Sequence, residues 1–454
     1  MGNVSASVGH VAHRDLGVAT KRALADMEGW LSGDPEFVIF ITGNYPKGKK
    51  QHKEALKVLE ASLGRDIPML GMTGMATFTA TDYSMRGAAV MGLQGVDVDP
   101  IRTPRICVRS KQKGQKIAKY FKSKAAPSEN SASVHFPKGL IFPGIMMNKL
   151  SSLKPSKLFA GFNLPTIYWF SGLMRRMGKL SSKMMNLSGI GMPYTGVYNA
   201  FDEMNKAGLQ YIGSGGGNIF TSAYSYQFYN YKLFQKAMVS FQLRSKTLKF
   251  GLGLASAATL TDKEVDIQDY IPGGFIVKIN GKWGKDAIFE LNDVEDPQLY
   301  YKHAQEMLYF DSAHPLCLVD PELGEDDVRI YGIGANPHLR AAMHSAPDHI
   351  MERIRKKKIK AVMGYQTGKQ IIESVPLRLQ GILEEAGILQ PKFGFVFDCV
   401  NCMMALSHRF GEIPKRIRDV LGDTPFLGIG AGGEFISLPN PMANMSMVSL
   451  LAGS

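Results

Sequence analysis

The chain has 454 residues, of which 45% are hydrophobic and 20% charged, so it is a folded protein with room for two or three domains and not a disordered or collagen-like chain. Its four cysteines are too few for a secreted disulfide framework and its start lacks the pattern of a secretory signal, so we expect an intracellular, cytoplasmic protein. The net charge of +13 is concentrated between residues 101 and 185, where 17 Lys and Arg face one acidic residue, Glu129.

The first hundred residues alternate between helical and strand-like patterns. Apolar residues at three- and four-residue spacing predict helices at 15–31 and 49–63. Short apolar runs rich in β-branched and aromatic residues predict strands at 37–42, 67–71 and 86–93. This order predicts a parallel βαβ unit in a sheet that is covered on both faces, and therefore an α/β fold.

Residues 101–206 break this alternation and form a predicted basic, aromatic-rich insert. Six lysines crowd 111–124, and the uncharged, aromatic-rich stretch 158–174 lies between cations. That stretch is shorter than the roughly 20 apolar residues of a membrane-spanning helix, and Gly and Pro interrupt it. Three interpretations stay open: contact with an anionic membrane surface, contact with a protein partner or second copy, and a core beside solvated lysines. The residues expected at a membrane or partner contact are Trp169, Phe170, Arg175 and Arg176.

The rest of the chain divides into a β-rich stretch, 207–292, and a second alternating region, 297–454, with a linker at 292–297. In the first, strands are predicted at 211–212, 224–231, 238–243, 248–255 and 275–279. In the second, helices are predicted at 297–309, 368–386 and 413–421, and strands at 316–319, 328–333, 360–364, 393–397, 425–430 and 445–451.

Two glycine-rich turns are candidate ligand sites. Glycine leaves backbone amides unobstructed, and such amides can form an anion-binding concavity beside a sheet edge. The first turn follows a predicted buried strand, where α/β sheets usually bind ligands. Glycine also permits tight turns without any ligand, so both interpretations stay open. The candidate residues are Gly71, Thr73 and Gly74 in the first turn and Gly215, Gly216, Gly217 and Asn218 in the second.

Cys399 and Cys402 have the spacing of a redox pair, and a thiolate would be favoured there if the segment opens a helix. Packing, ligand contact and redox sensing all remain open for this pair, and Cys399 is a candidate ligand-binding residue. No metal site is expected, because Cys107 and Cys317 have no partner at comparable spacing.

The order of these motifs resembles that of the FIST family. Segments 37–42 and 67–74 resemble the strand and the Gly-x-Thr/Ser turn of the family's first half, and 211–217, 226–228 and 250–253 resemble its glycine turn, sheet and Gly-x-Gly segment. The closest match covers 395–399, 408–411 and 425–435. The resemblance implies mixed sheets with flanking helices in two related halves. These are FIST N, from 1–100 and 207–292, and FIST C, from 297–454.

The resemblance also implies an input module that binds small ligands such as amino acids, in a family found beside kinases and chemoreceptors. A eukaryotic branch of the family serves as the substrate-recognition part of an F-box ligase subunit. No output domain is recognisable, so we expect a stand-alone receptor or subunit. Arg409 and Glu434, which fall in the family-like C-terminal motifs, are candidates for binding a zwitterionic or anionic ligand. Each could equally belong to a structural ion pair.

Some FIST proteins bind haem, which needs a neutral His or a Cys thiolate facing an apolar pocket. Many members carry a His after the Gly-x-Gly segment, but residues 254–258 of this chain are apolar or small. We therefore expect no cofactor, with a haem-based gas sensor as the third alternative. Its candidate ligands are His135, His314 and His408.

The sequence contains no nucleophile elbow, phosphate-binding loop, zinc-protease helix or dinucleotide fingerprint, so we do not expect an enzyme. The expected function is ligand sensing and signal transduction, through a small molecule or a protein partner. The alternative is a structural or scaffolding subunit of a larger assembly, including one at a membrane surface. Nucleic acid is not an expected partner, because no folded module that reads it is recognisable.

Overall fold

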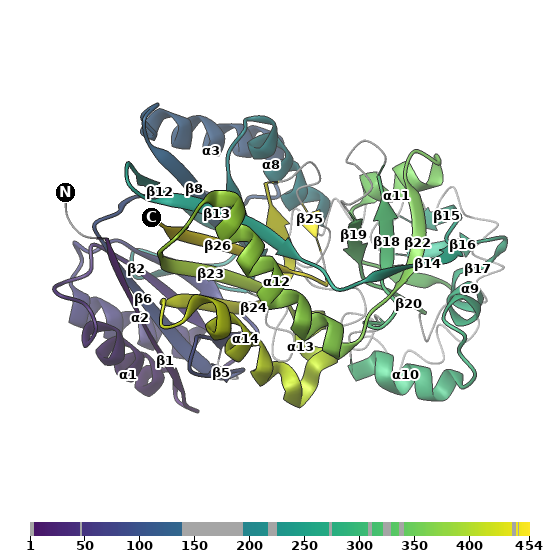
Figure 1. Ribbon diagram of the computed structural model, residues 1–454, viewed down its shortest axis with the longest axis horizontal. Coiled ribbons are helices and arrows are strands. Elements are labelled where there is room, and N and C mark those ends of the chain that lie inside the picture. Colours follow the sequence, from purple (N-terminus) through teal and green to yellow (C-terminus); the bar gives the residue numbers. More distant parts are fainter. Residues whose placement is uncertain are drawn as a thin grey trace.

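The computed structural model describes residues 4–45, 48–138, 194–216, 225–271, 275–306, 311–320, 328–335, 340–437, 442–443 and 445–454. Within them the protein has an α/β fold of mixed sheets with flanking helices, as the sequence predicts. A larger body contains both ends of the chain, and a smaller lobe is attached to one side of it (Figure 1).

The first sheet is built around a parallel strand pair near the N-terminus. In the described residues its spatial order is β1 (Ser5–Ala12), β6 (Gly87–Gln94), β2 (Phe37–Thr42), β3 (Met69–Thr73), β10 (Gln227–Tyr229) and β11 (Lys232–Phe234). β2 and β3 run parallel, and α2 (Lys49–Leu63) connects them, which confirms the predicted βαβ unit. α1 (Leu16–Glu28) begins after Asp15, whose side chain accepts a hydrogen bond from the Val18 amide.

The second sheet is larger and combines strands from distant parts of the sequence. Its described strands follow the order β13 (Lys249–Ala255), β26 (Met447–Gly453), β23 (Pro391–Cys399), β24 (Phe426–Ile436), β9 (Tyr211–Gly215), β8 (Asn130–Pro137), β12 (Ala237–Ser245) and β7 (Asp97–Pro104). Three short strands pair beside this path: β4 (Ala76–Phe78), β5 (Tyr83–Ser84) and β25 (Met442–Ala443). β23 and β24 run parallel to each other.

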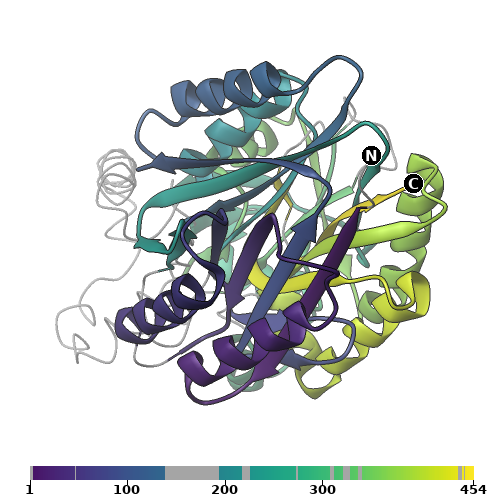
Figure 2. The same cartoon turned by 90° about the vertical axis from the view of Figure 1, so that its left-hand side faces the viewer.

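An apolar core lies between the two sheets. Along β2, Phe37, Ile39 and Ile41 belong to this core, whereas Val38 and Phe40 pack with residues of α1 and α2 on the other face. Helices also cover the outer face of the second sheet, so the body has the order helices, sheet, sheet, helices (Figure 2). These outer helices are α3 (Ser110–Lys124), α8 (Tyr194–Lys206), α12 (Gly368–Ala386), α13 (Val400–Leu406) and α14 (Glu412–Leu421), with a 3-10 turn at Ser407–Gly411.

The described residues between 259 and 365 form the smaller lobe (Figure 1). Tyr198 of α8 packs on His349 with ring centroids 4.1 Å apart, and the Tyr331 hydroxyl donates a hydrogen bond to the Met442 carbonyl oxygen at 3.0 Å. The lobe is thus joined to the body through a shared core. Its described strands are β14 (Thr259–Glu264), β15 (Ile267–Ile271), β16 (Phe275–Ile279), β17 (Lys282–Trp283), β18 (Leu316–Val319), β19 (Val328–Tyr331), β20 (Ile333–Ala335), β21 (Ala342–His344) and β22 (Lys360–Tyr365), and its helices are α9 (Gly284–Leu291), α10 (Pro297–Glu306) and α11 (Asp348–Arg355).

The beginning of the predicted basic insert belongs to the second sheet. β7 and β8 both pair with β12, and α3 packs beside α8. α3 buries Ile117 and Phe121, while most of its lysines are exposed. The structure therefore corrects the expected boundary for 101–138. A high density of Lys obscured the apolar period of an amphipathic helix.

The structure does not test the membrane or partner contact expected in the insert. Trp169, Phe170, Arg175 and Arg176 lie outside the described residues. No helix in the described ranges is both long enough and apolar enough to cross a bilayer.

The two sheets and the smaller lobe do not coincide with the two halves expected from the sequence, 1–292 and 297–454. The predicted linker at 292–297 lies between α9 and α10, inside the smaller lobe. β13, from the expected N-terminal half, pairs with β26 from the C-terminal half. Both halves therefore contribute strands to the second sheet, because pairing partners can be distant in sequence.

Candidate functional site

The two glycine turns chosen from the sequence meet at one strand, β24. The first turn reaches it just after Gly74, where the Met75 amide donates a hydrogen bond to the Gly430 carbonyl oxygen at 2.7 Å. The second turn reaches it through Gly215, which pairs with Gly432. Segments that are far apart in the chain therefore converge around residues 430–434.

The turns also touch each other at this junction. A Cβ atom on Gly216 would lie 2.7 Å from the Thr73 carbonyl oxygen, so the approach requires glycine. The Thr73 hydroxyl accepts a hydrogen bond from the Tyr226 amide at 3.0 Å. Cys399, the last residue of β23, pairs with Ala431 of the parallel strand β24. The junction thus lies at the carboxyl edge of a parallel pair, where α/β proteins usually bind ligands.

A bulge in β24 determines where Glu434 points. The register against β9 shifts between Gly432 and Glu434, and Gly433 has a φ of 78°, in the left-handed region that favours glycine. The extra residue reverses the alternation of side chains, so Ile436 joins the same core as Leu427. Glu434, two residues before Ile436, has no exposed surface (0%).

Glu434 belongs to a buried group of side chains that we call the acid–thiol cluster. Its members are Asp398, Cys399, Asn401, Cys402 and Glu434, none of which is more than 3% exposed. Asp398 and Cys399 end β23, and Asn401 and Cys402 lie in the first turn of α13. The parallel strands and the helix that follows directly from β23 therefore assemble the cluster.

Several polar atoms of the cluster have no hydrogen-bonding nitrogen or oxygen in the described part of the chain. They are Oδ2 of Asp398, both polar side-chain atoms of Asn401 and both carboxyl oxygens of Glu434. The Glu434 carboxyl group lies beside the Cys399 sulfur and its own backbone amide but has no well-formed bond to a nitrogen or oxygen of the described residues. Burying such groups without partners costs about 1–3 kcal/mol each. A ligand that supplied these partners would recover part of that free energy.

The surroundings of Cys399 favour its thiolate. Burial raises the pKa of this thiol, but hydrogen bonds from the Cys402 thiol and from the Asn401, Met445 and Cys402 amides outweigh burial and hold the pKa at about 7. The pKa of Cys402 is raised well above its ordinary value, first by its hydrogen bond to Cys399 and then by burial. The two thiols thus differ in pKa, and Cys399 loses its proton more readily than Cys402.

The two carboxyl groups are held in the protonated form. Burial, followed by the charge on Cys399, raises the pKa of Asp398 well above its ordinary value. Burial raises the pKa of Glu434 in the same way, with further contributions from Cys399 and Asp398. A cluster with a thiolate and two protonated carboxyl groups carries a net negative charge, and such strongly shifted pKa values are typical of functional sites.

A small cavity adjoins the cluster beneath α12 and α14. Its volume is about 10 Å³, and Asp398, Cys402 and Ser446 are among the residues that line it. This is room for about one water-sized molecule. The Ser446 hydroxyl also has no hydrogen-bond partner in the described residues.

Four other predicted residues lie away from the cluster or outside the described residues. Gly71 lies within β3, where a Cβ atom would be 1.8 Å from the Phe40 carbonyl oxygen, so close strand packing explains this glycine. Arg409 forms an ion pair with Glu412 at 2.7 Å, and both side chains are partly exposed. Arg409 is therefore part of a surface pair and does not accompany Glu434. Gly217 and Asn218 lie outside the described residues.

The histidines considered for haem differ in their surroundings. His135 is fully buried, and its nitrogens are bonded to Ser133 Oγ at 2.9 Å and Ser240 Oγ at 2.8 Å, so neither fits an axial ligand. Burial lowers its pKa to about 3. His314 pairs with Asp311 at 2.9 Å, and His408 is exposed on the 3-10 turn. Across the described ranges, no three His, Cys, Asp or Glu side chains are grouped to hold a metal ion.

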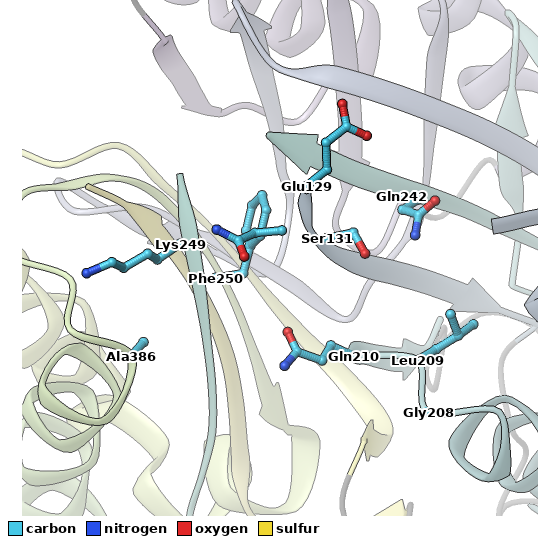
Figure 3. A pocket seen from close by; sticks show the side chains of 10 residues that line it. Glu129, Ser131, Gly208, Leu209, Gln210, Gln242, Lys249, Phe250 and Ala386 are labelled. Atoms are coloured by element: carbon cyan, nitrogen blue, oxygen red, sulfur yellow. The ribbon is translucent and has the colours of Figure 1, made fainter. Parts of the chain in front are cut away.

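A second polar hollow, the cleft, lies near the amino ends of β8 and β9 (Figure 3). Its volume is about 400 Å³. Glu129 pairs there with Arg244 at 2.9 Å, and Lys249 donates a hydrogen bond to the Gly387 carbonyl oxygen at 2.7 Å. Gln242 is 2% exposed, and its Oε1 has no partner in the described residues. The cleft is larger than the cavity beside the cluster, but its charged groups are already paired.

The sequence did not single out Asp398 and Asn401 as candidate ligand-binding residues. The available signal was an acidic residue within the apolar run that ends at Cys399, because an acidic residue rarely lies in a buried strand unless it has a role. No protein-family model matches the chain. A search of the curated proteins returns no significant match.

Proposed function

We propose that the protein is a non-enzymatic ligand-sensing module of the FIST type, which binds the positively charged amino group of a small molecule at the acid–thiol cluster. The observation that carries this proposal is Glu434, a fully buried carboxyl group that lies beside the Cys399 sulfur and whose two oxygens make no well-formed hydrogen bond to a nitrogen or oxygen of the described residues. Such a group is costly to retain unless something binds it.

The charge of the cluster favours a cation. The groups that act on the pKa of Asp398 and Glu434 include each other and Cys399, all of which are neutral or negative. An ammonium group in this place would lower the pKa of both carboxyl groups and form charge-assisted hydrogen bonds with them. Amino acids and simple primary amines carry the required group. Since the adjoining cavity has room for about one water-sized molecule, their binding requires α12 and α14 to move away from the cluster.

The position of the cluster suggests how binding would be transmitted. β24 joins the first-sheet turn through the Met75–Gly430 hydrogen bond and joins β9 through the bulge at Glu434. A ligand held by Glu434 would tighten this junction between the two sheets. Ordering of such a junction is a route to signalling by population shift.

A thermal-shift screen with amino acids and simple primary amines tests the proposal, followed by calorimetric titration of any hit. We expect Glu434→Gln to weaken binding by about 10- to 100-fold, because a hydrogen bond to a charged group contributes about 1.5–3 kcal/mol. Glu129→Gln in the cleft is the matched control and should bind like the parent. Equal affinity in Glu434→Gln and the parent would sink the proposal, as would a panel in which no compound binds.

A further inference from the structure

Cys399 and Cys402 are arranged as an unequal thiol pair. They are separated by two residues at the point where β23 passes into α13, and both are buried. The Cys402 thiol donates a hydrogen bond to the Cys399 sulfur. The two sulfurs are therefore neighbours, and a disulfide between them needs a local adjustment and no rearrangement of the fold.

The donors around Cys399 make it the nucleophile of the pair. Three backbone amides, from Asn401, Cys402 and Met445, point at its sulfur together with the Cys402 thiol. A thiolate is the reactive form of cysteine, and fixed donors stabilise it. Cys317 is also buried but lacks this arrangement, and burial raises its pKa to about 12.

The size of the adjoining cavity selects the reactant. Cys402 and Asp398 line the cavity of about 10 Å³, which has room for one water-sized molecule. Cys399 does not line it, so a reactant in the cavity reaches the Cys399 sulfur past the Cys402 thiol that is hydrogen-bonded to it. Glutathione disulfide and protein disulfides are far too large for it. Hydrogen peroxide is only slightly larger than water, and it oxidises thiolates.

We propose that Cys399 and Cys402 form a redox-active site that reacts with hydrogen peroxide and closes into an intramolecular disulfide. The Cys399 thiolate attacks one peroxide oxygen, the O–O bond breaks, and the departing hydroxide takes a proton to become water. The sulfur is oxidised to sulfenic acid while the peroxide is reduced. Cys402 then attacks the Cys399 sulfur, the S–O bond breaks, and a second water leaves as the S–S bond forms.

The carboxyl groups of the cluster fit the proton transfers in this reaction. Asp398 and Glu434 are held protonated beside the sulfur, so either can supply the proton that the departing hydroxide needs. Consumption of the thiolate also removes a negative charge that helps to keep both groups protonated. Oxidation would thus change the charge of the whole cluster.

Peptide mass spectrometry of the full-length protein after hydrogen peroxide treatment and alkylation tests the site. We expect a Cys399–Cys402 disulfide to accumulate at least about tenfold faster than any oxidation of Cys317, because thiolate content controls the rate. In Cys402→Ser, Cys399 should stop at sulfenic acid and be trapped by dimedone. Cys317→Ser is the matched control and should oxidise like the parent.

Two results would overturn the proposal. One is a parent protein in which Cys399 and Cys402 stay reduced while Cys317 or Cys107 is oxidised. The other is a mixed disulfide of Cys399 with glutathione after treatment with glutathione disulfide, which would show access that the cavity does not provide. The parent protein gives the decisive readout, so poor folding of a variant does not affect it. No amine ligand is involved, so this outcome is independent of the ligand test.

Discussion

The acid–thiol cluster and the cleft contain similar residue types in opposite surroundings. In the cleft, Glu129 accepts hydrogen bonds from the Ala126 amide and from Arg244, and these hold the pKa of its carboxyl group below the ordinary value. In the cluster, burial raises the pKa of Glu434 well above that value. The larger of the two hollows is therefore not the one with the strongly shifted pKa values. The charged groups of the large cleft are paired, whereas the small cavity adjoins buried carboxyl groups that are held in the protonated form.

Glycine substitutions should give the largest difference in stability, between β3 of the first sheet and the cleft. In Gly71→Ala, the new Cβ atom would meet the Phe40 carbonyl oxygen at 1.8 Å, and backbone cannot yield as a side chain can. We expect the free energy of unfolding to fall by about 3 kcal/mol or more. Gly208, which lines the cleft, has a φ of 72° with nothing near its Cβ position, so Gly208→Ala should cost about 1 kcal/mol. Urea unfolding measures both, and similar losses would contradict the close strand packing at the first turn.

The pH dependence of stability should have opposite signs at the two glutamates. Glu434 has a raised folded pKa, so its contribution is fully present below the unfolded value of 4.5 and is lost as pH rises towards the folded pKa. The parent should therefore lose stability relative to Glu434→Gln above that value, by up to about 1.4 kcal/mol per pH unit.

Glu129 has a lowered folded pKa, so its contribution is present above 4.5 and is lost as pH falls through the folded value. The parent should thus lose stability relative to Glu129→Gln as the solution becomes more acidic. Urea unfolding over a pH series gives the free energy of unfolding of each variant minus that of the parent. The buried histidines are the same in both proteins, so their contribution cancels in this difference. Slopes of the same sign for both variants would refute the contrast between the sites.

The smallest effect is expected for a cation of the cleft. Lys249→Met removes the hydrogen bond to the Gly387 carbonyl oxygen, which lies just after α12. We expect a loss of about 0.5 kcal/mol in the free energy of unfolding, because this donor is exposed to solvent. Peroxide oxidation of Cys399 should be unchanged. A slower reaction in this variant would mean that the cleft and the cluster are coupled.

The sequence predicted regular elements well where one local pattern decides them. β2, α2 and α12 have the predicted bounds, because their apolar spacing or capping residues are local signals. β7 and β8 were missed, since they are strands by virtue of pairing with β12, which lies more than a hundred residues away in the chain for both. Such pairing leaves little trace in a single sequence.

The candidate site was predicted in part for the same reason. Glycine turns and the cysteine spacing are visible in the sequence, and the structure brings Gly74, Gly216 and Cys399 to one junction. The burial of Asp398 is not visible, because it depends on how α12 and α14 cover the end of β23. Arg409 was grouped with Glu434 because both fall in the family-like C-terminal motifs, whereas its partner is the neighbouring Glu412.

Infrared spectroscopy near neutral pH shows directly whether the carboxyl groups of the acid–thiol cluster are protonated. We expect a carbonyl band from protonated, buried carboxyl groups in the parent protein, because burial raises the pKa of both Asp398 and Glu434. The band should weaken in Glu434→Gln and persist in Glu129→Gln. A parent spectrum without this band would mean that both groups are ionised and partnered, and would contradict the account.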